Sequence, residues 1–288
     1  MNSLTIPSPA KVNLFLKVLG RRRDRYHELF TVFHRISLRD QLILKKIDHP
    51  HFRLITHHPK LKRTRNNLIY HAYQVLCRVA SWKGGVEVNL KKNTPLAAGL
   101  GGGSSNAAHF LLGMNQLFDL GLPKKTLLRL GTQLGSDVPF FLYKVNQAIG
   151  IGRGDEIRPL PAKNKLWFVL VVPPFGIPTP LVYKRLCAPA LTRISHDATI
   201  TSAFLGRKEK RQWTWLLRND LFPASCLVRP ELKQIDALFD QLGATRRLMS
   251  GSGPTMFSIH KSKGEAQRIA RLVRRRRPSA NVFVCHTY

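Results

Sequence analysis

Acidic residues are scarce in this chain of 288 residues: 16 Asp and Glu stand against 47 Lys and Arg, and the formal net charge is +31. Such an excess of positive charge raises the possibility of a nucleic-acid-binding protein. The cations fall in short clusters without interleaved aromatic residues, unlike a base-stacking surface: Arg21 to Arg25, Lys60 to Arg65, Arg207 to Arg211 and Arg274 to Arg277. Solvated basic faces and a polyanion-binding surface both stay open, and charge alone does not choose between them.

Cysteine is also sparse, and its spacing excludes two classes of small, stapled domain. Cys77, Cys187, Cys226 and Cys285 lie far apart and form no Cys-x-x-Cys pair, whereas a structural zinc site or a disulfide framework would need closer, patterned spacing. No apolar run approaches the roughly 20 residues that span a bilayer. The first nine residues have neither the basic start nor the apolar stretch of a secretory signal. We therefore expect a cytoplasmic protein with reduced thiols and no membrane partner.

The length suggests two domains, at roughly 150 residues per domain. The turn-rich stretch 150–165 is the expected boundary, dividing the chain into residues 1–155 and 156–288. Periodicity predicts strands and helices intermixed in both halves, which indicates an α/β or α+β class. The predicted strands are 10–19, 86–90, 166–172 and 281–285, with a further strand-like stretch through 33–38. The predicted helices are 67–80, 124–134, 232–242 and 265–276, with a further helical run over 107–118 after the glycine-rich loop.

A glycine-rich loop between a predicted strand and a predicted helix is the most informative segment. Gly99, Gly101, Gly102 and Gly103 precede Ser104-Ser105, which we expect to cap the helix. Glycines let backbone N–H groups approach an anion, and a helix N-terminus adds partial positive charge. No Lys follows the glycines, which excludes a P-loop, and the dinucleotide fingerprint fits poorly because Ser104 replaces its third glycine. A phosphate cradle and a plain flexible turn remain the two interpretations of the glycines alone.

Three ordered motifs together resemble the superfamily of galactokinase, homoserine kinase, mevalonate kinase and phosphomevalonate kinase (GHMP kinases). They are Pro7-Ser-Pro-Ala-Lys-Val-Asn-Leu-Phe-Leu, the loop Pro95 to Ala108, and Leu248-Met-Ser-Gly-Ser-Gly-Pro-Thr-Met-Phe. The resemblance implies an α+β fold with an N-terminal domain like domain 2 of ribosomal protein S5 and a ferredoxin-like C-terminal domain. It places ATP and catalysis on the first domain, substrate binding on the second, and the active site in the cleft between them.

Four further segments narrow the resemblance to one branch of the superfamily: Ala10 to Leu16, Arg25-Tyr-His-Glu-Leu, Gly135-Ser-Asp-Val-Pro-Phe-Phe and Gly176-Ile-Pro-Thr-Pro. Kinases of that branch use ATP to phosphorylate the tertiary 2-hydroxyl of 4-diphosphocytidyl-2-C-methyl-D-erythritol, in the non-mevalonate route to isoprenoid precursors. The Tyr-His pair discriminates best, because homoserine and mevalonate contain no cytosine. A sister kinase for homoserine or a mevalonate derivative is the nearest alternative, and a nucleic-acid-binding protein that kept only the fold is another.

The resemblance also assigns roles to residues. Lys11 and Asp137 are the expected catalytic pair, although by residue type alone they could be a snorkelling lysine and a turn-capping aspartate. The expected ATP-binding residues are Pro95, Leu96, Ala97, Ala98, Gly99, Leu100, Gly101, Gly102, Gly103, Ser104 and Ser105. The expected substrate-binding residues are Asn13, Tyr26, His27, Phe33, Thr179, Tyr183, Gly251 and Gly253.

The expected ligands follow from these roles. ATP is the co-substrate and carries Mg²⁺ with it, with Ser105 as a candidate ligand of that ion. No acidic residues have a clear metal-binding spacing, so we expect no dedicated metal site in the protein. The other partner is the cytidine diphosphate-linked small molecule, and a nucleic acid is not expected despite the charge. We expect a monomer or a homodimer, and the role of Asn219-Asp220 stays open.

Overall fold

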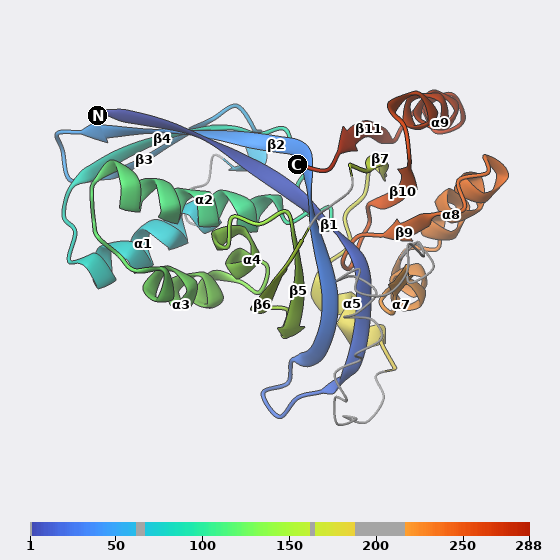
Figure 1. Cartoon of the computed structure of the whole chain (residues 1–288), viewed down its shortest axis with the longest axis horizontal. Coiled ribbons are helices and arrows are strands. Elements are labelled where there is room, and N and C mark those ends of the chain that lie inside the picture. The colour runs from blue at the N-terminus through green and yellow to red at the C-terminus, as the bar shows by residue number, and fades with distance from the viewer. Residues whose placement is uncertain (1, 62–66, 162–164, 188–216) are drawn as a thin grey trace. The chain divides into compact units, whose positions relative to one another are not determined.

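The computed structural model describes residues 2–61, 67–161, 165–187 and 217–288 (Figure 1). The basic cluster Arg207 to Arg211 and most of the cluster Lys60 to Arg65 lie outside these residues. Runs of strands and runs of helices follow one another along the chain, which confirms the α+β class. By internal contacts the chain forms two compact units, and each is treated separately. The first unit comprises Met1–Ala10, Leu38–Pro95 and Gly101–Lys144, and the second comprises Lys11–Ser37, Leu96–Leu100 and Val145–Tyr288.

The first unit packs helices against strands. Strands β1 (Ser3–Arg21) and β2 (His27–Ile47) are long enough to contribute to both units, and here β2 pairs antiparallel with β4 (Gly85–Lys91), which pairs parallel with β3 (Phe52–Thr56). A 3₁₀ turn, η1 (Pro59–Leu61), follows β3. The helices, cyan to green in Figure 1, are α1 (Leu68–Ala80), α2 (Gly102–Leu117), α3 (Lys124–Leu134) and α4 (Val138–Leu142).

Local sequence explains why α1 begins and ends where it does. The Asn67 side chain accepts a hydrogen bond from the Ile69 N–H at 3.0 Å and so caps the helix. Ile69, Ala72 and Leu76 recur at helical spacing and are fully buried. Ser81 then leaves the helix in the left-handed conformation.

The second unit contains a four-stranded antiparallel sheet in the order β11-β7-β10-β9. Its strands are β7 (Trp167–Val172), β9 (Arg247–Met249), β10 (Met256–His260) and β11 (Asn281–His286). The helices of this unit are α5 (Thr179–Arg185), α7 (Phe222–Val228), α8 (Glu231–Gln241) and α9 (Lys263–Arg276). A short strand, β8 (Arg218–Asn219), pairs parallel with β1.

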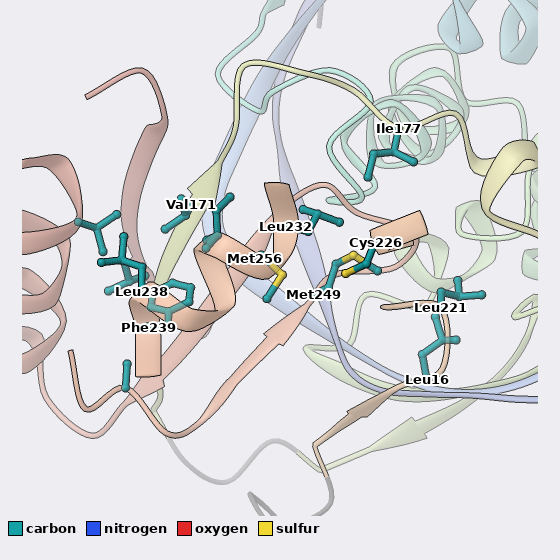
Figure 2. Packing of buried hydrophobic residues seen from close by; sticks show 14 of the residues in the cluster. Leu16, Val171, Ile177, Leu221, Cys226, Leu232, Leu238, Phe239, Met249 and Met256 are labelled. Atoms are coloured by element: carbon teal, nitrogen blue, oxygen red, sulfur yellow. The ribbon is translucent and has the colours of Figure 1, made fainter. Parts of the chain in front are cut away.

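One hydrophobic cluster holds these elements of the second unit together. Figure 2 shows Val171, Phe239 and Met256, from β7, α8 and β10, pointing into a common interior. Leu16 of β1 and Leu221 next to α7 belong to the same cluster. Burial of each such side chain contributes about 1.5–3 kcal/mol to folding, so β1 is anchored beside the sheet and the helices that pack on it.

The interpretation of residues 150–165 as a turn-rich stretch is wrong for 150–152 and 156–160, which are strand residues, whereas 153–155 do form a turn. A hairpin of β5 (Gln147–Gly152) and β6 (Glu156–Leu160) occupies it, and β5 also pairs with β2. Gly150 lies in β5, and a Cβ there would lie 2.5 Å from the Phe33 ring, so the glycine allows that ring to pack closely. Pro159 is tolerated because β6 pairs with β5 alone among the described strands.

The domain boundary between residues 155 and 156 stays a prediction. Within the described parts of the chain, no helix is long and apolar enough to cross a membrane.

Candidate active site

Lys11 starts a chain of buried polar side chains in the second unit. Lys11 and Asn13 share one side of β1, and Lys11 Nζ donates to Asn13 Oδ1 at 2.7 Å. Asn13 Nδ2 donates to Thr31 Oγ1 at 2.8 Å, and the Thr31 hydroxyl donates to the Phe15 carbonyl at 2.7 Å. Lys11 is 3% exposed, so its ammonium is held inside and does not snorkel to solvent.

The two glycine-rich motifs meet within the second unit, although 150 residues separate them in sequence. Ser250 Oγ donates to the Gly99 carbonyl at 2.9 Å. Gly99 has a φ of +75°, and a Cβ on it would lie 2.2 Å from the Ser250 carbonyl oxygen, so only glycine fits there. A Cβ on Gly251 would lie 3.6 Å from Lys11 Nζ and 3.5 Å from Asn13 Oδ1. The predicted catalytic lysine therefore lies against the backbone of the C-terminal glycine motif.

Asn219 holds this glycine motif in place. Its Nδ2 donates to the carbonyls of Met249 and Gly251, both at 2.8 Å, and its Oδ1 accepts from the Leu221 N–H at 2.9 Å. Asp220 accepts from the Val18 N–H at 2.9 Å, which ties β8 to β1. The Asn219-Asp220 pair therefore braces the turn beside Lys11.

Of the residues expected at the cytosine, His27 and Tyr183 are in direct contact. The rings of His27 and Tyr183 stack with centroids 4.8 Å apart and an interplanar angle of 26°. Burial, and to a smaller extent the charge of Arg21, lowers the pKa of His27, so its imidazole is neutral at pH 7. Tyr26 is 55% exposed, and the Arg153 guanidinium lies 4.9 Å from its ring centroid.

Thr179 and Phe33 lie at two other places in the second unit. Thr179, at the start of α5, has its hydroxyl 2.8 Å from the Ser252 hydroxyl, so α5 is joined to the C-terminal glycine motif. Phe33 is 1% exposed, and Lys11 Nζ lies 5.5 Å from its ring centroid. Phe33 therefore packs against the Lys11 ammonium and does not line the pocket around His27 and Tyr183.

The start of α2, in the first unit, presents the second half of the glycine loop. Gly101 is the N-cap, with a φ of +66°, and the helix begins at Gly102. The expectation that Ser104 and Ser105 cap the helix is wrong, because the glycines already form its first turn. Ser105 is fully buried and accepts a hydrogen bond from Ser8 Oγ at 2.8 Å. Gly103 is exposed, so the accessible donors for a phosphate are backbone groups near it.

A buried ion pair lies next to the first residues of α2. Lys92 Nζ pairs with Asp40, and their side chains are 3% and 0% exposed. Asp40 also accepts from the N–H groups of Asn93 and Thr94, at 2.8 and 2.7 Å, and from Asn106 Nδ2 at 2.9 Å. Burial lowers the pKa of Lys92, and the Asp40 carboxylate partly opposes this shift. A Cβ on Gly102 would lie 2.9 Å from Lys92 Nζ, so this ammonium lies close to the first residue of α2, in the glycine-rich loop.

Asp137 also belongs to the first unit and lies at the start of α4. It is the N-cap residue, yet its side chain makes no capping hydrogen bond to the helix. Pro139 lies in the first turn, where its missing N–H costs nothing. The carboxylate is half-buried and is not used as a helix cap, in contrast to the turn-capping interpretation of its sequence position.

Comparison with known proteins identifies the family. Residues 67–144 match the GHMP kinases N terminal domain, and residues 211–278 match the GHMP kinases C terminal domain. The 4-diphosphocytidyl-2-C-methyl-D-erythritol kinase of Moorella thermoacetica is 42% identical over 274 residues, which are 94% of each chain. The enzyme of the same name from Syntrophus aciditrophicus is 38% identical over 92% of each chain. The chain belongs to the 4-diphosphocytidyl-2-C-methyl-D-erythritol kinase family.

Solved structures agree with this family. A crystal structure of 4-(cytidine 5'-diphospho)-2C-methyl-D-erythritol kinase is 34% identical, covers 98% of both chains and superposes with a TM-score of 0.78. The homoserine kinase of Cytophaga hutchinsonii superposes with a TM-score of 0.74 over 100% of this chain and 95% of that one, at 18% identity, and so shares the fold. The predicted GHMP kinase fold is therefore confirmed.

Sequence reasoning missed several residues that lie at these places. Thr31, which orients Asn13, follows no motif that a single sequence displays. Lys92 lies three residues before Pro95, and a lysine so close to a glycine-rich loop could have been a signal. Its partner Asp40 is 52 residues away and could not be paired with it before the fold was known.

Proposed function

We propose that this chain transfers the γ-phosphoryl group of Mg·ATP to the 2-hydroxyl of 4-diphosphocytidyl-2-C-methyl-D-erythritol. The observation that carries the proposal is the position of Lys11, held buried by Asn13 against the backbone of Gly251, in a chain of this kinase family. The neutral stacked pair of His27 and Tyr183 supports the choice of a cytidine-bearing substrate, because it offers an aromatic surface and a ring-edge hydrogen-bonding group.

In the proposed reaction the substrate O–H bond breaks and a new bond forms between that oxygen and the γ-phosphorus. The bond from the γ-phosphorus to the bridging oxygen breaks, and ADP leaves. Asp137 accepts the hydroxyl proton, and the positive charge of Lys11 stabilises the negative charge that develops on the oxygen. Backbone N–H groups near Gly103, at the start of α2, bind the ATP phosphates, whose charge the Mg²⁺ partly neutralises.

An ADP-release assay tests the reaction with three acceptors: 4-diphosphocytidyl-2-C-methyl-D-erythritol, homoserine and mevalonate. Turnover with the cytidyl compound alone is the expected result, and turnover with either other acceptor instead would refute the substrate assignment. Replacement of Asp137 by Asn should lower kcat by about 10²–10⁴-fold and leave the Kd of ATP nearly unchanged, because the carboxylate acts on the proton.

Asp119→Asn is the matched control for the aspartate. Asp119 is an exposed residue of the same unit with a φ of +49°, a conformation that Asn adopts as readily. Near-normal turnover of Asp137→Asn would remove this residue from the proton transfer, whereas an equal loss in Asp119→Asn would point to a general loss of folded enzyme.

A further inference from the structure

A cationic pocket surrounds the stacked rings of His27 and Tyr183 in the second unit. The pocket has a volume of about 460 Å³, and its polar lining comes from Arg21, Arg25, His27, Tyr183 and Lys184. Arg21 ends β1, Arg25 lies in the turn before β2, and Lys184 follows Tyr183 on α5. One side of the pocket is therefore aromatic, and the rest of its polar lining is positively charged.

The charge of this pocket is not neutralised by the acidic residues of the neighbouring turn. Arg22, which does not line the pocket, pairs with both Asp24 and Glu28, at 3.2 and 2.5 Å. Among the residues that the structure describes, Arg21, Arg25 and Lys184 make no ion pair, and no carboxylate lines the pocket. Three cations gathered around one cavity without a counter-charge favour an anionic ligand.

The backbone at Arg25 is the second observation, and it is independent of the charge. Arg25 has a φ of +69°, in the left-handed region that glycine adopts without steric cost and arginine does not. The turn is closed by backbone hydrogen bonds from Arg25 N to the Arg22 carbonyl and from Arg22 N to the Tyr26 carbonyl, at 3.2 and 2.8 Å. These bonds need no side chain at position 25, so glycine would serve the turn better. A strained residue whose side chain lines a cavity indicates a role for that side chain.

We propose that Arg25, together with Arg21 and Lys184, binds the diphosphate of the nucleotide-linked substrate and makes this pocket selective for a nucleoside diphosphate over the free nucleoside. The planar guanidinium of Arg25 donates two parallel hydrogen bonds to phosphate oxygens, and Lys184 acts as a point charge. The base occupies the aromatic side formed by His27 and Tyr183. This inference rests on the proposed function for the identity of the base.

Calorimetric binding of CDP, cytidine and ADP to the whole protein tests the inference without relying on turnover. Arg25→Gly removes the charge and the backbone strain together. We expect it to weaken CDP binding about tenfold or more, to leave cytidine binding within twofold, and to keep or raise Tm. Arg25→Lys should weaken CDP binding by less, because it keeps the charge and loses the paired hydrogen bonds.

Arg23→Ala is the matched control, because Arg23 is exposed in the same turn and does not line the pocket. It should leave all three affinities within twofold. Equal CDP affinity in wild type and Arg25→Gly overturns the inference, and so does an equal loss in Arg23→Ala, which would show a diffuse effect of charge. If Arg25→Gly loses as much affinity for ADP as for CDP, the inference is also overturned, since Arg25 would then bind the phosphates of the adenine nucleotide.

The same measurements separate this inference from the proposed function. Selective CDP binding that depends on Arg25, in a protein without kinase turnover, would refute the proposed function and support the inference. Kinase turnover of the wild type, together with unchanged CDP binding in Arg25→Gly, would support the proposed function and refute the inference.

Discussion

The buried pair of Lys92 and Asp40 allows a direct test of how the glycine-rich loop at the start of α2 is supported. Asp40→Asn keeps the size of the side chain and its Oδ1, which can still accept from the N–H groups of Asn93 and Thr94. The change removes the negative charge beside Lys92, whose side chain is 3% exposed. It therefore isolates the ion pair from the backbone hydrogen bonds of the same carboxylate.

The expected loss in the free energy of unfolding is about 4 kcal/mol, because a buried charge without its partner typically costs 3–5 kcal/mol. Domains of ordinary stability have about 5–15 kcal/mol in total, so Asp40→Asn should be only marginally folded. Lys92→Met combined with Asp40→Asn should recover much of the loss, because no buried charge then remains. The Asn106 amide, which donates to Asp40 at 2.9 Å, can reverse to accept from the new Asn.

Urea unfolding followed by circular dichroism, on wild type, both single variants and the double variant, measures the coupling. We expect a coupling energy of at least about 1.5 kcal/mol between the two sites, within the range for residues in direct contact. A loss below about 1 kcal/mol for Asp40→Asn, or single losses that simply add, would refute the reasoning that this pair is energetically coupled.

Two further predictions concern a glycine and a buried histidine. Gly99→Ala should lower the free energy of unfolding by at least about 2 kcal/mol, since its Cβ would meet the Ser250 carbonyl in a left-handed backbone. Gly103→Ala, whose Cβ would lie 3.5 Å from Leu68 at the helix start, should change the free energy of unfolding by less than about 1 kcal/mol. Equal urea midpoints for the two variants would contradict this contrast. Burial lowers the pKa of His34 from 6.5 to about 4. As the pH falls, the unfolded chain therefore binds the proton before the folded protein does. The contribution of His34 to stability is complete above pH 6.5 and falls by about 3 kcal/mol as the pH drops toward 4. An NMR titration that places the His34 pKa near 6.5 would contradict it.

Local sequence signals predicted the regular elements where a few neighbouring residues decide the outcome. The cap at Asn67 and the helical spacing of Ile69, Ala72 and Leu76 set α1, and the predicted helix 124–134 coincides with α3. The hairpin of β5 and β6 was missed because its glycines and Pro159 look like turn signals in isolation. A glycine at position 150 leaves room for the Phe33 ring, and Pro159 is tolerated because β6 pairs with β5 alone among the described strands; both contacts lie outside any local window.

By itself the sequence determined the motifs, and with them the family, because a phosphate loop needs its glycines and serines next to one another in the chain. Only the tertiary structure decided what those motifs touch: Gly99 meets Ser250, Asn219 braces the turn at Gly251, and Lys92 finds Asp40. It also decided that Arg25 bends into a left-handed turn beside a cationic pocket. The physical reason is that a polar side chain inside a protein takes its partner from whatever the packing brings within about 3 Å. That partner is set by the whole fold and not by neighbours in sequence.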